Sequence, residues 1–373
     1  MNGLHMKKRI IMKRIKVCVI GCGMIAQSAH IPAYLSNNNF EITAVCDAVE
    51  QSAKCVSEKF GIARYYTDVS QMLEKEKPEA VSVCVPNMLH KKYVMLALDY
   101  GANVLCEKPL ALTVYDAEEM FSATKKQGKI LMACQTLRFL PERLAVKKME
   151  LNNEIGDIYY AELSRIRRRG IPTWGKFHIK EFSGGGALID IGVHGIDSAI
   201  WLMNNPNPIS VTAVMSKVHA DELGSSEQSG ALKGGVGSEG FKSEEMNVES
   251  FAAGNVRFEN GSELSFKVAW AANLPEENNI IIVGNKKGVD TENRKVFYGP
   301  DNADELLFEP NGFKTEPFFG HFCIVDNLYK CLAGSEEPFV KPEETVNVSA
   351  VIEAAYLSAS SKREIEIAEL RRF

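Results

Sequence analysis

A glycine-rich turn between a short apolar run and a helical pattern constrains the fold of this 373-residue chain more than any other feature. The run Ile15–Ile20 leads directly into Gly21–Ala26, whose sequence GCGMIA fits the pattern GxGxxA. Gly21 permits a tight turn, Gly23 lets the backbone approach a phosphate, and Ala26 is small enough for a helix to pack closely on a strand. The helix N-terminus also offers free N–H groups and a partial positive charge. The pattern therefore predicts a strand, a phosphate-binding turn and a helix, in that order.

Up to Cys134 the chain alternates short apolar runs with longer amphipathic stretches. Runs that are apolar on both faces are typical of buried strands, and helices between them imply a parallel sheet. The predicted strands are Ile15–Ile20, Glu41–Cys46, Ala80–Val85, Asn103–Cys106 and Ile130–Cys134. The predicted helices are Val49–Phe60, His90–Tyr100 and Thr113–Gln127, followed by Gly61, Gly101 and Gly128 as C-terminal stops. Together they predict a doubly wound α/β domain.

An acidic side chain, Asp47, ends the second predicted strand. A carboxylate at this position of a dinucleotide-binding sheet can accept hydrogen bonds from the two adenosine ribose hydroxyls. A 2′-phosphate would meet that carboxylate, and the neighbouring Ala48 offers no guanidinium to compensate. The sequence therefore favours NAD over NADP. The alternative is that Asp47 only caps a loop and touches no ligand.

Three further motifs follow in order: VCVPNMLH at Val83–His90, VLCEKPL at Val104–Leu110, and GGGALIDIGVHGID at Gly184–Asp197. With GxGxxA and the acidic strand end before them, they resemble the Gfo/Idh/MocA oxidoreductases, which include glucose–fructose oxidoreductase and inositol dehydrogenase. The resemblance covers almost the whole chain. It implies a Rossmann domain, here residues 15–135, and an α+β domain, here residues 136–373, with a large open antiparallel sheet. That sheet would carry one face of the active site and mediate contacts of a homo-oligomer, a dimer or tetramer.

The resemblance also implies an activity: reversible hydride transfer between NAD and a secondary alcohol or ketone of a sugar, cyclitol or sugar derivative. Some family members instead hydrolyse glycosides through a transient oxidation, and a few only sense NAD and a sugar. A sensor is expected to have lost Lys108 or His194, and this chain keeps both. The dehydrogenase is therefore favoured, with the hydrolase as the open alternative. The expected cofactor-binding residues are Gly21, Gly23, Met24, Ile25, Ala26, Asp47, Pro86, Asn87, His90, Glu107 and Lys108.

Oxidation of an alcohol needs a base for the O–H proton and a positive group near the developing alkoxide. Lys108 follows a predicted strand at the sheet edge where ligands bind, and its bond to Pro109 is a candidate cis peptide. Asp190 and His194 are four residues apart, so a helix would place them on one face. We expect these three as catalytic residues, with His194 as acid/base and Asp190 supporting it. No metal is expected, because no cysteine or second histidine joins the motif.

Substrate contacts are expected from Arg138, Trp174 and Asp197. Arg138 matches an arginine of the family, although a structural ion pair would explain it nearly as well. Trp174 can stack on the C–H face of a sugar. It follows the basic run Arg165–Arg169, in which one arginine can bind a carboxylate or phosphate; solvated surface arginines are an equal alternative. A substrate with an acid group is thus a hypothesis at this stage.

The remaining segments predict further strands at Glu249–Phe258, Glu263–Trp270 and Ile280–Val283, with a hairpin turn at Asn260–Gly261. Helices are predicted at Pro317–Leu332 and Glu344–Ser360, and the second of them can pack back near the Rossmann domain. Residues 220–246 predict an insertion, either a lid or only a loop. The basic residues 1–14 predict a solvated extension, with an electrostatic tether or a start at Met6 or Met12 as alternatives.

Bulk properties exclude several other classes of protein. The formal net charge is -5, which argues against nucleic acid as the main partner. No apolar stretch approaches the ~18 residues that span a bilayer, so we expect no membrane contact and a cytoplasmic location. The nine cysteines include no CxxC pair, and five of them lie in the predicted strands. They are interpreted as reduced, buried side chains that act as small hydrophobes.

Overall fold

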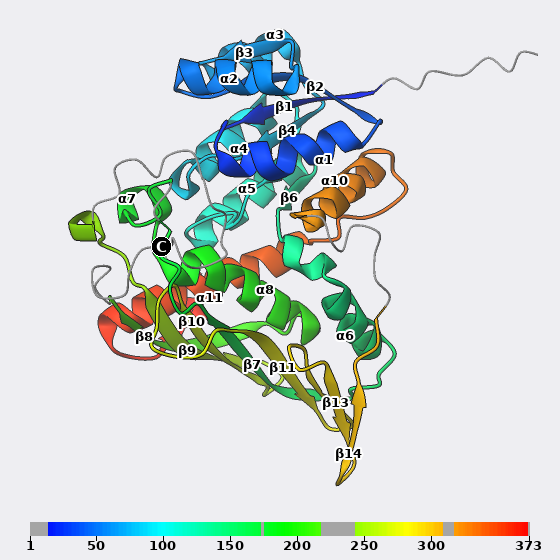
Figure 1. Cartoon of the computed structure of the whole chain (residues 1–373), viewed down its shortest axis with the longest axis vertical. Coiled ribbons are helices and arrows are strands. Elements are labelled where there is room, and N and C mark those ends of the chain that lie inside the picture. The colour runs from blue at the N-terminus through cyan, green and yellow to red at the C-terminus, as the bar shows by residue number, and fades with distance from the viewer. Residues whose placement is uncertain (1–13, 173–174, 218–242, 309–316, 372–373) are drawn as a thin grey trace, which may run out of the picture.

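The computed structural model describes residues 14–172, 175–217, 243–308 and 317–371 (Figure 1). Its first sheet has six strands in the order β3-β2-β1-β4-β5-β6, all parallel. The strands are β1 Ile15–Ile20, β2 Phe40–Cys46, β3 Arg64–Tyr66, β4 Ala80–Val83, β5 Asn103–Cys106 and β6 Leu131–Ala133. This is the Rossmann strand order, and it confirms the predicted doubly wound sheet. The edge strand β3 was not predicted.

Helices cover both faces of this sheet. They are α1 Ile31–Ser36, α2 Glu50–Phe60, α3 Val69–Glu76, α4 His90–Asp99 and α5 Val114–Gln127. A π-helical turn, Ala26–His30, precedes α1 and continues into it. The predicted start and stop signals hold at α5: Thr113 accepts a hydrogen bond from the Asp116 amide, and Gly128 ends the helix in a left-handed conformation.

A second sheet of nine strands follows, in the order β14-β13-β12-β11-β7-β10-β9-β8-β15. Its strands are β7 Ile158–Ile166, β8 Pro208–Ser216, β9 Phe251–Phe258, β10 Glu263–Ala269, β11 Glu277–Gly284, β12 Gly288–Asp290, β13 Lys295–Tyr298, β14 Asn302–Glu305 and β15 Ile365–Glu366. Neighbours pair antiparallel except β7 and β10, which are parallel. The expected antiparallel sheet is therefore confirmed with one exception at its centre. The predicted turn at Asn260–Gly261 joins β9 to β10.

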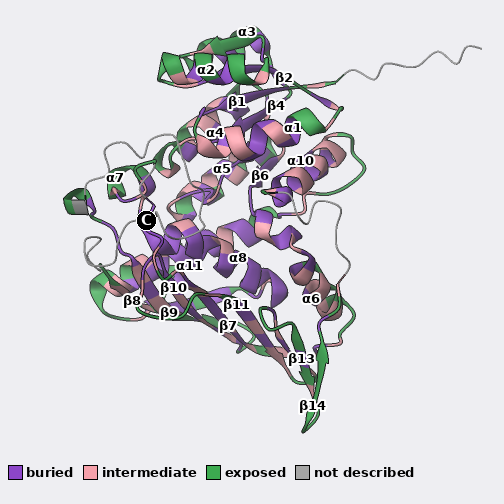
Figure 2. Ribbon diagram, viewed as in Figure 1, coloured by how far each residue is buried: buried purple, intermediate pink, exposed green. Residues whose placement is uncertain are grey.

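One face of the second sheet is covered by α8 (Val193–Leu202) and α11 (Pro342–Ser361), with α6 (Pro141–Leu151) beside them (Figure 1). Figure 2 shows that the buried residues concentrate between these helices and the sheet. Contact is close, because a side chain at Gly195 would lie only 2.6 Å from Leu163 of β7. This layer forms the largest apolar core of the described chain.

Two C-terminal helices tie the sheets together. Helix α10 (Phe319–Leu332) packs against α1, and α11 packs against both α5 and α8. A hydrogen bond of 2.7 Å from the Val114 amide to the Glu353 carboxylate fixes α11 to the start of α5. The helix at α11 thus contacts the first domain as well as the second.

All nine cysteines are free, and the five in the predicted strands are buried. Among the described residues, no helix has both the length and the apolar character to cross a lipid bilayer. Most of the predicted insertion, residues 218–242, lies outside the described residues, as do residues 1–13 of the basic extension.

Candidate active site

A cavity of about 300 Å³ lies beyond the carboxyl ends of β1, β2 and β4. Gly21 and Gly23 line it, together with Asp47 and Pro86. Gly21 has a φ of +95°, and a Cβ there would lie 2.4 Å from the carbonyl oxygen of Cys84, so the turn accepts only glycine. A Cβ at Gly23 would meet no atom within 4 Å, which leaves its backbone open to a ligand. Ala26 is fully buried against the sheet.

Asp47 lies at the edge of this first cavity and already binds two backbone amides. Its Oδ2 accepts a hydrogen bond of 2.9 Å from Cys22, and its Oδ1 accepts one of 2.9 Å from Val49. The carboxylate is therefore fixed against the glycine-rich turn. Each carboxylate oxygen has a second acceptor site, which a ribose hydroxyl can use. The loop-capping role and the ligand role are thus compatible at this residue.

A second cavity, of about 290 Å³, shares Val85 with the first and lies between the two sheets. It brings together eight of the residues predicted from sequence, which come from segments far apart in the chain. They are Met24, Ile25, Asn87, His90, Glu107, Lys108, Asp190 and His194. A larger hollow of about 1120 Å³ between α5, α10 and α11 contains none of the predicted residues.

Lys108 and Asp190 form an ion pair in the second cavity. The Lys108 Nζ donates 2.8 Å to the Asp190 backbone oxygen and 3.1 Å to its Oδ1, and the two side chains are 15% and 13% exposed. Asp190 Oδ2 accepts a hydrogen bond of 2.9 Å from the Trp270 indole. Burial alone would raise the pKa of Asp190, but Lys108, Arg167 and the Trp270 bond lower it below its usual value. The Lys108–Pro109 peptide is cis.

His194 borders the same cavity one turn along the helix from Asp190. Burial is the largest cause of a pKa well below its usual value, and the charges of Lys108 and Arg165 lower it further. The imidazole is therefore neutral at physiological pH. Its Nδ1 is shielded from solvent and has no hydrogen-bond partner among the described residues. A neutral imidazole with a free nitrogen can accept a proton or a hydrogen bond from a bound hydroxyl.

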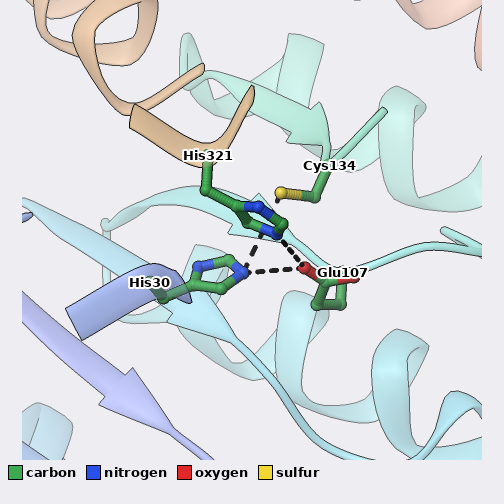
Figure 3. Close-up of side chains that lie close together, drawn as sticks. All are labelled: His30, Glu107, Cys134 and His321. Carbon is green, nitrogen blue, oxygen red and sulfur yellow. Dashed lines mark hydrogen bonds and ion pairs between the residues drawn. The ribbon is translucent and has the colours of Figure 1, made fainter. Parts of the chain in front are cut away.

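Glu107 is held by a buried polar cluster (Figure 3). Its Oε1 lies 2.8 Å from the His30 Nε2 and 3.2 Å from the His321 Nε2, and its Oε2 accepts from the Lys108 amide. Burial acts to raise the pKa of Glu107, but the interactions with His30 and His321 hold it well below the usual value. With Cys134, the cluster places four donor atoms within 4.8 Å of one another, a set that could hold a metal ion. Hydrogen bonding between the carboxylate and two imidazoles accounts for the same arrangement.

Asn87 and His90 line the second cavity, and their side chains form hydrogen bonds with neighbouring segments. The Asn87 amide donates 2.7 Å to the backbone oxygen of Ser183, which links the first domain to the glycine loop before Asp190. His90 is buried, with Nδ1 2.7 Å from the Pro109 oxygen and Nε2 2.9 Å from the Val85 oxygen. These contacts connect the ends of β4 and β5 and position the segment that carries Lys108.

Arg138 and Asp197 require a correction, because both lie outside the cavity. Arg138 is 0% exposed and Asp197 1%, and they form a double hydrogen bond of 2.8 and 2.6 Å. The Nη1 of Arg138 forms an ion pair with Glu344 of α11. Asp197 is seven residues beyond Asp190, which carries it about 10 Å along the helix axis into the core. The expected substrate contacts are replaced by a buried ion-pair network.

Of the basic run, only Arg165 and Arg167 line the second cavity. Arg168 is exposed, and Arg169 donates hydrogen bonds to the Arg168 and Ala272 carbonyls and to the Asn273 side chain. Trp174, a predicted sugar contact, lies outside the described residues. Sequence reasoning missed several lining residues: Thr136, Leu137, Phe177, Phe318 and His321. Thr136 and Leu137 precede Arg138 in the segment that resembles the family, whereas the other three belong to no motif and reach the site only through their positions in the fold.

The buried histidines predict acid sensitivity. Burial is the largest cause of a lowered pKa at His30, His90 and His194. Below about pH 6.5 the histidines of the unfolded chain bind protons, whereas the same three histidines stay neutral in the folded protein. The free energy of unfolding is therefore expected to fall with pH below about 6.5, by up to about 1.4 kcal/mol per pH unit for each histidine. Urea denaturation between about pH 7.5 and 5.5 measures this. A free energy of unfolding that stays constant or increases as the pH falls over that range would show that these buried histidines are not neutral in the folded protein.

Two family descriptions match the chain. The first, an oxidoreductase family with an NAD-binding Rossmann fold, matches residues 15–135, and the GFO/IDH/MocA C-terminal domain matches residues 144–290. A D-glucoside 3-dehydrogenase from Escherichia coli (strain K12) is 33% identical over 81% of this chain and 83% of the relative. A D-apiose dehydrogenase from Paraburkholderia graminis is 26% identical over 96% of this chain and 91% of the relative.

The fold also matches solved structures. An aldose–aldose oxidoreductase from Caulobacter crescentus, crystallised with glycerol, has a TM-score of 0.76 at 23% identity. The match covers 95% of this chain and all of that chain. It therefore extends over both sheets, including the layer that carries Asp190 and His194.

Proposed function

The protein belongs to the Gfo/Idh/MocA family of oxidoreductases, and from that membership we propose that it transfers a hydride between NAD and a secondary alcohol carbon of a sugar or sugar derivative. One observation carries the proposal: Lys108, Asp190 and His194 line one cavity, and that cavity adjoins the glycine-rich turn. Oxidation of an alcohol requires a base and a positive group near the developing alkoxide; the neutral imidazole and the ammonium can fill these two roles, and the carboxylate orients the ammonium.

The first cavity fits a dinucleotide. The open backbone at Gly23 and the N-terminus of the helix at Met24 suit a pyrophosphate, and the fixed Asp47 carboxylate suits ribose hydroxyls. Ala48 beside it supplies no positive charge for a 2′-phosphate, which supports NAD over NADP. The bound nicotinamide supplies the site that accepts the hydride.

The residues of the second cavity then have separate roles in the oxidation of the alcohol. The Lys108 ammonium, held in place by Asp190, stabilises negative charge on the substrate oxygen. His194, which lines the same cavity, accepts the hydroxyl proton as the C–H bond breaks. Asp190 is buried between Lys108 and Trp270, so it keeps the ammonium oriented. In the reverse direction, the same imidazole returns the proton to a ketone.

The class of substrate is supported by the relatives. Two proteins that align with most of this chain are named as dehydrogenases of a D-glucoside and of D-apiose, both of them sugars or sugar derivatives. A cavity of about 290 Å³ lies at the small end of ligand pockets and suits one sugar ring. We therefore place a monosaccharide unit in the second cavity, with its reacting carbinol near Lys108.

The proposal is tested by NADH absorbance with purified protein, NAD or NADP, and a panel of cyclitols, aldoses, glycosides, uronates and sugar phosphates. Steady NADH formation with a sugar is the expected result. Confirmed NAD binding without reduction on any substrate would contradict it. Glycoside cleavage without net NADH would then support the hydrolase that uses a transient oxidation.

The cofactor proposal predicts the effect of Asp47→Ala. Loss of a charged acceptor for the ribose hydroxyls is expected to weaken NAD binding by roughly 10- to 100-fold. The NADP affinity should fall less or rise, because the repulsion of the 2′-phosphate is removed. Fluorescence titration with each cofactor measures both constants, and Asp99→Ala, which changes an exposed residue at the end of α4 outside the cavity, serves as the control. Equal losses for NAD and NADP would show that Asp47 only shapes the loop.

A further inference from the structure

Three cationic side chains line the second cavity: Lys108, Arg165 and Arg167. Lys108 is neutralised by Asp190 at 3.1 Å. The remaining carboxylate at the cavity, Glu107, is engaged by His30 and His321. Neither arginine forms an ion pair with a described residue, and the three cations at the cavity outnumber the two carboxylates, so the described part of the cavity carries an excess of positive charge.

Arg165 reaches the cavity because of its position in β7. Side chains alternate along a strand, so Arg165 shares a face with Ala161 and Leu163, both buried in the core beneath α8. The strand ends one residue later, and Arg167 continues the same alternation. An arginine on the helix-covered face of a sheet is unusual, because burial of an unpaired charge is unfavourable by several kcal/mol.

The immediate surroundings of Arg165 confirm that its charge is poorly compensated. Its Nη1 is shielded from solvent and finds no hydrogen-bond partner among the described residues. Burial, together with the charge of Arg167, lowers the pKa of Arg165 to about 10, although Asp190 acts in the opposite direction. The guanidinium still remains charged at neutral pH. Arg167 makes one long contact, 3.4 Å to the Gly170 carbonyl.

Arg143 shows what a purely structural arginine looks like in the same region. It is buried and does not line the second cavity; its Nη1 donates 2.9 Å to the Thr291 hydroxyl, and its Nε has no hydrogen-bond partner among the described residues. Arg165 has no such bond, although it lies at the cavity wall beside the catalytic groups. What distinguishes Arg165 is its position at the cavity wall, where a bound molecule can contact its guanidinium group.

We propose that the substrate carries an oxyanion, a carboxylate or a phosphate, and that Arg165 and Arg167 bind it in the second cavity. This inference rests on the proposed function, because it names the class of sugar that enters the same site. Guanidinium groups bind such anions through charge-assisted, often paired hydrogen bonds. The apolar side chains of Pro172 and Phe177 line the same cavity and can contact the C–H faces of the ring.

The test compares NAD-loaded wild-type protein with Arg165→Gln and Arg168→Gln. Arg168 is the matched control, since it lies three residues away and is exposed. Equilibrium binding of glucose, glucuronate and glucose 6-phosphate is measured by calorimetry, and NADH formation is followed in parallel. For wild type, we expect at least one anionic sugar to bind roughly 10- to 100-fold more tightly than glucose. Arg165→Gln should remove that preference, and Arg168→Gln should retain it.

The two anionic ligands separate a carboxylate from a phosphate as the recognised group. Equal binding of all three sugars by wild type, or equal losses for neutral and anionic sugars in Arg165→Gln, would overturn the inference. Turnover of neutral glycosides without any preference for anions would overturn it and leave the proposed hydride transfer standing. Tight binding of an anionic sugar through Arg165 without NADH formation would support the inference and contradict the proposed hydride transfer.

Thermal denaturation without sugar provides a second readout. Because Arg165 has no anionic partner among the described residues, Arg165→Gln is expected to leave the Tm unchanged or to raise it. A fall of several degrees would show that Arg165 is a structural residue and would overturn the inference. A structural role and a binding role therefore predict opposite shifts.

Discussion

Replacement of Lys108 by methionine is expected to lower kcat for sugar oxidation by roughly a thousandfold. The Lys108 Nζ is held 3.1 Å from the Asp190 carboxylate in the cavity that borders the glycine-rich turn. Methionine keeps most of the side-chain volume but removes the charge that stabilises the alkoxide. The loss should appear mainly in kcat, because stabilisation of a developing charge acts in the transition state.

The affinity of the same variant for NAD is measured alongside its activity. The NAD dissociation constant should change little, since Gly21, Gly23 and Asp47 line the first cavity and Lys108 does not. Lys54→Met on the exposed face of α2 is the control and should keep full activity. Retention of more than about a tenth of the wild-type kcat by Lys108→Met would rule out a catalytic ammonium at this position.

Replacement of Arg138 by methionine is expected to reduce the free energy of unfolding by about 3–5 kcal/mol. Arg138 is fully buried between Asp197 and Glu344, so its removal leaves two carboxylates without a countercharge. Buried carboxylates in that state must take up protons or admit water, and both destabilise the fold. Glu344 then keeps hydrogen bonds of 2.8 Å from the Asn205 side chain and 3.3 Å from the Lys341 amide, neither of which supplies a countercharge.

Urea denaturation measures this loss against Arg257→Met. Arg257 is largely exposed, and its pair with Glu364 is long, at 3.6 Å, so that variant should lose less than about 1 kcal/mol. The double variant Arg138→Met/Asp197→Leu should recover part of the loss, because it removes one of the orphaned charges. A stable Arg138→Met protein with a raised KM would instead restore the substrate role expected from sequence.

Much of the first domain could be predicted because its signals are local. The strand runs, the glycine stops and GxGxxA each depend on neighbours in the chain, and all five predicted strands and three predicted helices are present. The elements of this domain that were not predicted are short. β3 has three residues and no apolar run, and α3 was missed although Asp68 caps its start by accepting from the Gln71 amide.

The candidate catalytic side chains were predicted from spacing and from the family resemblance, but their partners were not. Asp190 and His194 follow from their separation on a helix, whereas Trp270, which fixes Asp190, comes from the end of a distant strand. The cluster around Glu107 joins His30 and His321, which are 77 and 214 residues away from it. No motif marks either histidine.

The sequence by itself determined the dinucleotide-binding fold, the family and the residues at the sheet edge, because each depends on local spacing and on backbone limits such as those at Gly21. Only the tertiary structure decided which charged side chains line the cavity and which pair with each other. Arg138 and Asp197 are 59 residues apart and meet in the core, whereas Arg165 lines the cavity without a partner among the described residues. The reason is physical: the role of a charge is set by its burial and by its nearest opposite charge, and both depend on how distant segments pack.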